Sequence, residues 1–439
     1  MTAVSSRERA RSFEYHDVVV DATTGTITCA YACEGIEFQE VASFEDGIDL
    51  GAPGVRSAAV LYHLLAGLSY YKAFAAHTLE LGDLETGEAT RALLAGAIEG
   101  GLAEFAYRNG LDLGQVVLRG GAPARRVELA PPARGPLVPF GGGIDSIVTA
   151  IELASDPDEA LFICSSGSAR FDAIEHPAAR TGLPIVRCTR QLDEKILASK
   201  ASGWLDGHVP VTAIISSLAL VAAVAQGRSQ VVMSNERSAS APNLVHEGVP
   251  VNHQWSKSLE CENLLRRAID ECFESGPSYY SALRDRSELW VASRFAGHPE
   301  YLDEFMSCNR AFLQDPEQRA TTWCGACDKC LFTDLVLAPF VPQAALSAVF
   351  SGHEPIADEC RRGDLEVLVG LTVRPKPFEC VGDANECATA LVATAARPDR
   401  AAQRHLSELA ERCNVQSLDE LLVAAGPTNA NAHAARDLL

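Results

Sequence analysis

Residues 137–146 read Leu-Val-Pro-Phe-Gly-Gly-Gly-Ile-Asp-Ser, and this stretch is the strongest indication of the fold. An apolar run enters three consecutive glycines, and residues 147–153 continue as Ile-Val-Thr-Ala-Ile-Glu-Leu. This order predicts a strand, a tight turn and a helix. Three glycines allow the backbone to come close to a ligand and to turn its N–H groups toward it. The positive end of the helix dipole adds to this effect, so the turn suits a phosphate or pyrophosphate group.

Five residues of the turn are candidate binding residues. Gly141, Gly142 and Gly143 would supply backbone N–H groups, and Ser146 can donate its hydroxyl. Asp145 is ill suited to touch a phosphate directly because both groups are negatively charged, so we expect it to act through a bridging Mg²⁺ ion. A simple tight connection is the alternative, since a glycine-rich sequence alone is weakly specific. The turn has neither the Gly-Lys-Ser/Thr of a Walker loop nor the Gly-x-Gly-x-x-Gly pattern.

The composition is that of a globular protein of two or three domains. The chain has 439 residues, 47% of them hydrophobic and 22% charged, and a net charge of −21. This charge argues against nucleic acid and anionic membranes as partners, because both are polyanions. Without a membrane-length apolar run or an apolar signal core, we expect a cytoplasmic protein. Its fourteen cysteines should then be thiols or metal ligands rather than disulfides, and the oligomeric state is open.

The chain is expected to contain three regions. Residues 1–134 predict an α+β domain, because alternating segments are followed by helical ones. Residues 135–340 alternate apolar strands with helical stretches, which predicts an α/β fold with a doubly wound parallel sheet. Residues 341–439 predict a mainly helical region. The main elements are expected as strands at 14–21, 26–32, 36–42, 160–165, 183–188 and 230–234, and as helices at 57–78, 90–108, 211–226 and 384–396.

Polar residues follow two of the predicted strands, at 164–168 and 234–238. In a doubly wound sheet, ligands bind at the carboxyl ends of the strands, so both segments should converge with the glycine turn on one crevice. A further polar segment at 252–258, Asn-His-Gln-Trp-Ser-Lys-Ser, places an acid/base group, a cation and two amides within six residues. We interpret it as part of a substrate site, with an ordinary surface loop as the alternative.

Four cysteines have the spacing of a metal site: Cys308, Cys324, Cys327 and Cys330. Two thiolates separated by two residues can bind one ion in a tight turn, and Gly325 permits that turn. Four thiolates suit tetrahedral Zn²⁺ and leave no ligand position open, so we expect a structural zinc site. An iron–sulfur cluster, a redox-active Cys-x-x-Cys pair and unligated thiols are the alternatives.

The glycine turn resembles the PP-loop of the ATP pyrophosphatases, Ser-Gly-Gly-x-Asp-Ser, with Gly141 in place of the first Ser. With Cys-Gly-x-Cys-x-x-Cys, it is similar to the 7-cyano-7-deazaguanine synthase group over about residues 135–335. The chain also carries Asn-Glu-Arg-Ser-Ala, Asn-His-Gln-Trp-Ser-Lys and Lys-Pro-Phe-Glu-Cys-Val-Gly. Over its whole length it resembles the ATP-dependent UDP-N-acetylmuramoyl-L-alanyl-L-glutamate epimerases of bacterial cell-wall synthesis.

The resemblance implies an enzyme that inverts the terminal L-Glu of UDP-MurNAc-L-Ala-L-Glu to D-Glu and releases AMP and pyrophosphate. ATP would adenylate the carboxylate, because the α proton beside a charged carboxylate is very weakly acidic. The glycine turn and Asp145 would then hold the pyrophosphate and Mg²⁺. Arg237 and Lys257 are candidates for phosphate or carboxylate contact, and His253 and Glu236 for acid/base transfer.

Two other functions fit the same sequence. A deazaguanine-type synthase would activate a carboxylate for attack by ammonia, and a non-catalytic protein would only bind the nucleotide. The additional terminal regions argue against the synthase, because a small base needs less recognition surface. The intact Asp145-Ser146 pair argues against the non-catalytic protein.

Overall fold

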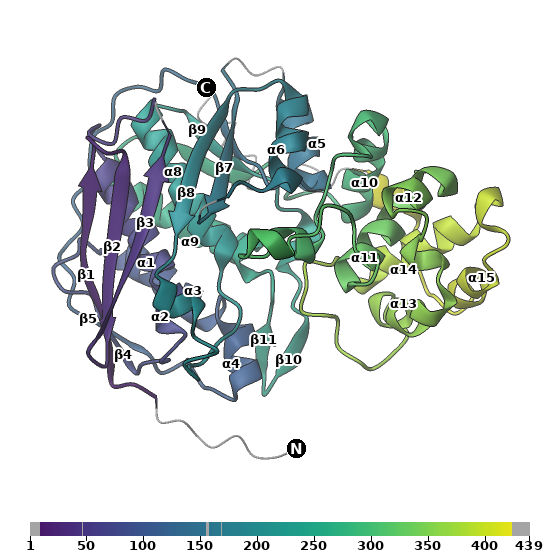
Figure 1. Ribbon diagram of the computed structural model, residues 1–439, viewed down its shortest axis with the longest axis horizontal. Helices are drawn as coiled ribbons and strands as arrows, with labels where there is room; N and C mark the ends of the chain where they lie inside the picture. Colours follow the sequence, from purple (N-terminus) through teal and green to yellow (C-terminus); the bar gives the residue numbers. More distant parts are fainter. Residues whose placement is uncertain (1–8, 46, 155–157, 168, 424–439) are drawn as a thin grey trace.

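The protein is an α/β protein built on one ten-stranded, mostly parallel sheet (Figure 1). The computed structural model describes residues 9–45, 47–154, 158–167 and 169–423. The strand order is β12-β9-β6-β7-β8-β3-β2-β1-β4-β5. Its first five strands are mutually parallel and are β12 (Ser278–Ser281), β9 (Gln230–Met233), β6 (Leu137–Pro139), β7 (Ala160–Ser166) and β8 (Ile185–Gln191).

The N-terminal strands continue the same sheet. β1 (Ser12–Asp21), β2 (Thr26–Cys33) and β3 (Ile36–Phe44) form an antiparallel meander, and β4 (Thr78–Glu80) and β5 (Val117–Arg119) lie parallel to β1. β3 pairs antiparallel with β8, from Val41 opposite Gln191 to Phe44 opposite Cys188. The sheet is therefore continuous across residue 134, and the domain boundaries proposed from the sequence stay a prediction.

Helices cover both faces of the parallel strands. One face packs against helices that include α1 (Val55–Ala66), α3 (Glu88–Glu99), α8 (Val211–Gln226) and α9 (Leu259–Cys272). The other packs against α5 (Ile144–Leu153) and α6 (Asp172–Thr181), and the same core continues through α10 (Glu288–Ala296) to α11 (Asp328–Leu337). Leu137 and Val231 point into the first core, whereas their neighbours Val138 and Val232 point into the second. This explains the unbroken apolar strands, because side chains alternate between faces and both faces are buried.

Two long helices predicted from the sequence are confirmed in part, since each is interrupted near a glycine that packs against an aromatic ring. The segment 57–78 folds as α1, then α2 (Leu68–Tyr71), then β4. At Gly67 a Cβ would lie 2.4 Å from Cε1 of Tyr15. The segment 90–108 folds as α3 and α4 (Ala103–Asn109), and at Gly100 a Cβ would lie 2.2 Å from Nε1 of Trp255. Both breaks therefore admit an aromatic ring from elsewhere in the chain.

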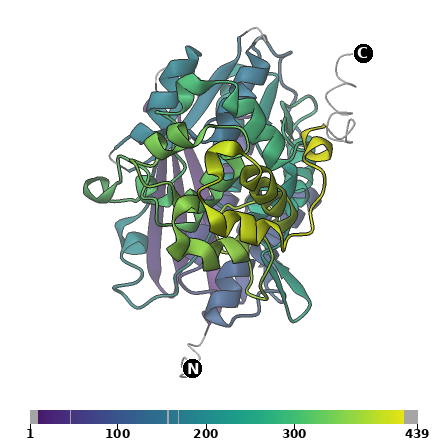
Figure 2. The ribbon, with the colours of Figure 1, turned by 90° about the vertical axis from the view of Figure 1, so that its right-hand side faces the viewer.

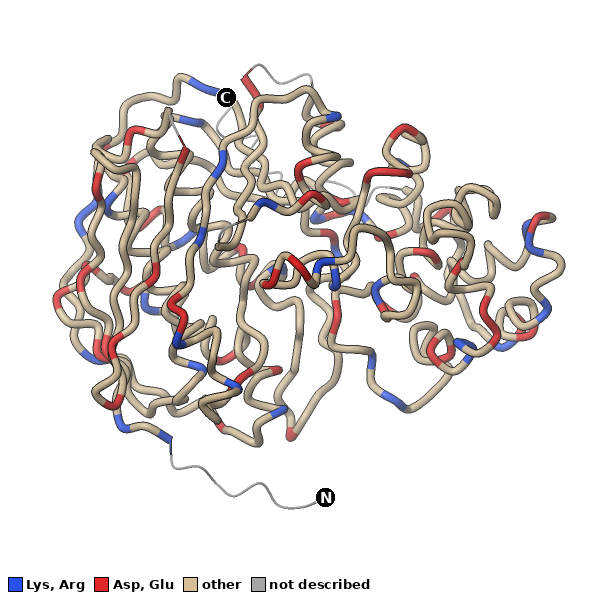
Figure 3. Tube along the Cα trace, in the orientation of Figure 1, with Lys and Arg blue, Asp and Glu red and all other residues tan. Residues whose placement is uncertain are grey.

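The C-terminal part is helical and forms a separate layer beside the sheet (Figures 1 and 2). Besides α11, it contains α12 (Gln343–Val349), α13 (Arg362–Leu368), α14 (Ala384–Ala395), α15 (Arg404–Ala410) and α16 (Leu418–Leu422). The predicted helix at 384–396 is confirmed, while residues 424–439 of this region lie outside the described part. Figure 3 shows acidic and basic residues interspersed along the described trace. No helix in the described ranges has both the length and the apolar character needed to cross a membrane.

Candidate active site

The glycine turn connects β6 to α5 in a conformation that depends on its glycines. Gly142 has a φ of +76°, and a Cβ there would lie 2.2 Å from the carbonyl oxygen of Ala173. The N–H of Met306 donates to the carbonyl oxygen of Gly142 at 3.2 Å, and the Ser146 hydroxyl donates to that of Gly143 at 3.0 Å. No side chain caps the start of α5, so its first N–H groups are open to an anionic ligand.

Substitution of Gly142 is expected to cost far more stability than substitution of Gly141. Gly142→Ala is expected to destabilise the protein by at least about 2 kcal/mol, because of its positive φ and the close carbonyl. Gly141→Ser is expected to change the free energy of unfolding by less than about 0.5 kcal/mol, because a Cβ there meets nothing within 4 Å. Urea denaturation of both variants provides the comparison. Equal stabilities would contradict this account of the turn.

The turn follows β6, the strand from which the chain adds strands first on one side of the sheet and then on the other. The chain runs from β6 outward to β7 and β8, then returns to β9 on the opposite side of β6. Such a reversal opens a crevice at the carboxyl ends of the strands. Three buried oxygen atoms near these strand ends have no hydrogen-bond partner among the described residues: Oδ1 of Asp145, Oγ of Ser166 and Oγ of Ser234. Buried oxygens without partners are uncommon, so this group indicates a ligand.

Three carboxyl groups gather beside the turn and influence one another. Burial raises the pKa of Asp145 to about 6, and the charge of Glu236 adds to the increase. Burial raises the pKa of Glu288 well above its ordinary value, again with a contribution from Glu236. The Ser238 hydroxyl lies 3.1 Å from Oε1 of Glu236 and 3.4 Å from Oε1 of Glu288. The unpartnered carboxylate oxygen of Asp145 is of the kind that Mg²⁺ prefers as a ligand.

A buried arginine positions two of the predicted site residues. Arg284 donates to the carbonyl oxygens of Glu236 at 3.1 Å and Lys257 at 2.8 Å. Its guanidinium forms an ion pair with Glu262 at 2.8 Å, and both side chains are almost fully buried. Lys257 in turn lowers the pKa of Glu236, against the effect of burial. Arg284 was not identified from the sequence, because it lies in an irregular segment between β12 and α10.

His253 is held between an acidic side chain and a thiol. Its Nδ1 lies 2.5 Å from Oε2 of Glu104 on α4, and the next residue, Gln254, donates to the carbonyl oxygen of Val381 beside Cys380 at 3.2 Å. Burial opposes the charged form, but Cys380 and Glu104 together raise the pKa of His253 to about 9. Burial likewise opposes the thiolate, yet Lys257 and His253 lower the pKa of Cys380 to about 6. Both pKa shifts favour a thiolate and an imidazolium in this site at neutral pH.

Of the residues predicted from the sequence, Asp145, Lys257 and His253 interact electrostatically with Cys380, and Glu236 interacts with Asp145 and Lys257. Arg237 lies at the margin, where its guanidinium is 3.3 Å from Glu386 and its side chain is 48% exposed. Cys380 itself was not proposed as a site residue. The signal for it was its place in the Lys-Pro-Phe-Glu-Cys-Val-Gly segment.

The four cysteines form one compact cluster. The Sγ atom of Cys330 lies 3.6 Å from that of Cys324 and 3.4 Å from that of Cys327, and all four Sγ atoms, with Cys308, lie within 4.8 Å of one another. Thiolates around a tetrahedral Zn²⁺ are about 3.8 Å apart, given Zn–S bonds of about 2.3 Å. The cluster can therefore hold a metal. It also adjoins the site, because Lys329 between two of these cysteines donates to the carbonyl oxygen of Cys380 at 2.6 Å.

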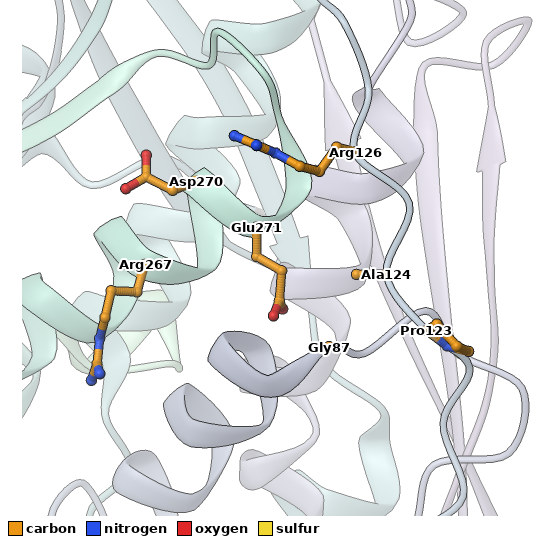
Figure 4. A pocket seen from close by; sticks show the side chains of 7 residues that line it. All are labelled: Gly87, Pro123, Ala124, Arg126, Arg267, Asp270 and Glu271. Atoms are coloured by element: carbon orange, nitrogen blue, oxygen red, sulfur yellow. The ribbon is translucent and has the colours of Figure 1, made fainter.

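A separate surface hollow lies between the start of α3 and the end of α9 and is lined by none of the residues of the glycine turn (Figure 4). Its most prominent acid, Glu271, accepts the backbone N–H groups of Ala89 at 2.8 Å and Thr90 at 2.9 Å. Glu271 thereby caps the start of α3. Arg126, on the segment that follows β5, donates to the carbonyl oxygen of Phe273 at 2.9 Å. These groups are engaged in holding the fold together, so the glycine turn is the stronger candidate site.

Comparisons with known proteins cover nearly the whole chain. The family model described as MurL N-terminal domain matches residues 4–282, and that described as MurL C-terminal domain matches residues 304–421. A relative from Salinispora tropica is 38% identical over 400 residues, covering 87% of this chain and 84% of its own. One from Xanthomonas oryzae pv. oryzae is 36% identical over 403 residues, covering 90% and 88%. Both are named UDP-N-acetyl-alpha-D-muramoyl-L-alanyl-L-glutamate epimerase. No solved structure matches the chain.

Proposed function

The chain belongs to the MurL family, and from that premise we propose that it inverts the terminal L-Glu of UDP-MurNAc-L-Ala-L-Glu to D-Glu in an ATP-dependent reaction. The reaction would serve peptidoglycan precursor synthesis in the cytoplasm. The proposal rests on relatives named as this epimerase, whose alignments cover 87–90% of the chain. The crevice at the glycine turn supports the requirement for ATP.

The need for ATP follows from the acidity of the substrate. Removing the α proton of a glutamate carboxylate would place a carbanion beside an existing negative charge. Transfer of AMP to that carboxylate, with release of pyrophosphate, neutralises the charge and allows the carbanion to delocalise as an enolate. After a proton returns on the opposite face, water releases AMP and the D-glutamate carboxylate. Each turnover therefore consumes one ATP and one water molecule.

The glycine turn is the proposed site of the ATP phosphates. Gly141, Gly142 and Gly143 would offer backbone N–H groups, together with the uncapped start of α5. Ser146 is adjacent, although its hydroxyl donates to Gly143 in this structure. Asp145, with its unpartnered Oδ1, and Glu236 would hold a Mg²⁺ ion that offsets the phosphate charges.

Cations beside the turn would receive the other anionic groups. Lys257 is half-buried and interacts with Cys380, Glu236 and Asp145, so its charge is directed into the crevice. It can stabilise the enolate oxygen or the carboxylate being activated. Arg237, at the margin and about half-exposed, would contact an outer phosphate of the substrate. The cysteine cluster is proposed to hold a structural Zn²⁺.

The test is incubation of the protein with ATP, Mg²⁺ and UDP-MurNAc-L-Ala-L-Glu in D₂O. AMP release together with deuterium at the α carbon of a D-Glu product is the expected result. AMP without deuterium would mean that the carboxylate is activated for another fate, such as amide formation. The absence of both signals would contradict the proposed function.

A further inference from the structure

We propose that Cys380 is the catalytic residue that removes the α proton of the activated L-glutamyl group, with His253 and Glu104 as positioning residues for its thiol. The inference rests on the proposed function and assigns one chemical step within it. It draws on the arrangement of three side chains from widely separated parts of the sequence. Cys380 as a residue is half-buried rather than enclosed.

The backbone around Cys380 is fixed by three separate segments of the site. The carbonyl oxygen of Cys380 accepts from Nζ of Lys329 at 2.6 Å, and that of Val381 accepts from Nε2 of Gln254 at 3.2 Å. The carbonyl oxygen of Pro377 accepts from Nδ2 of Asn243 at 2.6 Å. A segment held at three carbonyls in this way presents its thiol at a defined place, as proton transfer to carbon requires.

A chain of polar side chains leads from Glu104 through His253 toward the thiol. Glu104 is buried, with one carboxylate oxygen 2.6 Å from Nε of Arg108 and the other 2.5 Å from Nδ1 of His253. A carboxylate on one ring nitrogen fixes the imidazole orientation and favours its protonated form. The positive charge of His253, whose neighbour Gln254 binds the segment of Cys380, then lowers the pKa of the Cys380 thiol and favours the thiolate. The ring of His208 lies against that of His253, with centroids 4.3 Å apart and planes tilted by 41°, and limits its rotation.

Glu104, His208 and His253 also have the composition of a metal site, with candidate ligand atoms within 4.8 Å of one another. We interpret them as a hydrogen-bonded chain instead, because both oxygens of Glu104 are engaged by Arg108 and His253. A carboxylate already paired with two cationic side chains is a poor metal ligand.

Cys380 interacts electrostatically with Asp145 at the glycine turn. Of all groups that interact with the ammonium of Lys257, Cys380 has the largest electrostatic effect. Lys257 is fixed in turn by Arg284, which binds its carbonyl oxygen. The thiolate, an ammonium and the proposed ATP site therefore adjoin one another. A glutamyl carboxylate activated at the turn would place its α carbon beside these groups.

The proposed step balances without an added oxidant or reductant. The Cys380 thiolate takes the α proton, so the C–H bond breaks and an S–H bond forms. The electron pair of the C–H bond passes into the enolate of the acyl adenylate. The α carbon then takes a solvent-derived proton on its opposite face, and Cys380 returns its own proton to solvent.

The experiment separates activation of the carboxylate from proton transfer at the α carbon. For Cys380→Ser, UDP-MurNAc-L-Ala-L-Glu should still promote exchange of labelled pyrophosphate into ATP, whereas deuterium uptake at the glutamate α carbon should fall at least about 100-fold. Cys360→Ser is the matched control, because that cysteine is exposed and lies outside the site. It should retain both signals.

A second variant tests the positioning role. Glu104→Gln keeps the side-chain shape but removes the charge that favours the imidazolium. Deuterium uptake is expected to fall about 10-fold or more while pyrophosphate exchange is retained. A structural defect would reduce both signals together.

Two results would overturn the inference. Deuterium uptake within about threefold of the native rate in Cys380→Ser would show that another group removes the proton. Parallel loss of pyrophosphate exchange in both folded variants would place Cys380 and Glu104 in activation rather than in proton transfer. If the unmodified protein gave neither signal, the proposed function would fail instead.

Discussion

The Asp145→Asn variant is expected to lose ATP-dependent turnover by about 1,000-fold while keeping its fold, which corresponds to ~4 kcal/mol of transition-state stabilisation. Asp145 follows the three glycines on the first turn of α5, and its buried Oδ1 has no hydrogen-bond partner among the described residues. An amide of the same shape is a far weaker ligand for Mg²⁺ than a carboxylate. AMP release with UDP-MurNAc-L-Ala-L-Glu provides the measurement.

The same variant should change how stability depends on pH. Burial raises the pKa of Asp145 from 3.8 to about 6, so the folded protein holds a proton that the unfolded chain releases. The free energy of unfolding contributed by this group is therefore present below pH 4 and is lost as pH rises toward 6. Asn cannot ionise, so the variant should show a flatter dependence over this range and equal or greater stability at pH 7.

Asp172→Asn is the matched control, since Asp172 is an exposed acid on the first turn of the neighbouring helix α6. It should retain native turnover. If Asp145→Asn kept more than about a tenth of native AMP release, Asp145 could not be the main metal ligand. A comparable loss in Asp172→Asn would indicate a general effect of negative charge near the turn.

The local features of the site could be predicted from the sequence. Three glycines between an apolar strand and a helix specify the turn through backbone conformation alone, and Gly142 does adopt a positive φ. The spacing of Cys324, Cys327 and Cys330 likewise places three thiols in one turn. Each of these signals lies within ten residues, so no knowledge of tertiary structure is needed.

Features that depend on tertiary contacts could not be predicted in this way. The strands β4, β5 and β12 contain only three or four residues, too few to show an alternating pattern. Pairing of β3 with β8 joins the N-terminal meander to the parallel strands, although about 140 residues separate them in sequence. Cys380 is similar, because its chemical setting comes from His253 and Lys257, more than 120 residues earlier. A scattered cysteine gains its role only when the fold supplies these neighbours.

The Cys327→Ser variant is expected to lose both bound zinc and stability, with a decrease of at least about 3 kcal/mol in the free energy of unfolding. Cys327 caps the start of α11, where its Sγ accepts the N–H of Cys330 at 3.4 Å. Arg361 ties the same turn to the C-terminal helices by donating to the carbonyl oxygens of Gly325 and Cys327, each at 3.1 Å. Loss of the metal would therefore weaken the cap of α11 and the hydrogen bonds from Arg361. Metal analysis and urea denaturation provide the measurements.

The effect should also reach the active site, because Lys329 at the start of α11 donates to the carbonyl oxygen of Cys380. Deuterium uptake is therefore expected to fall in Cys327→Ser even where the protein stays folded. Cys413→Ser is the control, since Cys413 is likewise half-buried but lies outside the cluster. It should retain zinc, stability and turnover. Stoichiometric zinc together with native stability in Cys327→Ser would rule out a structural four-cysteine site, because three thiolates and water would then suffice to hold the fold.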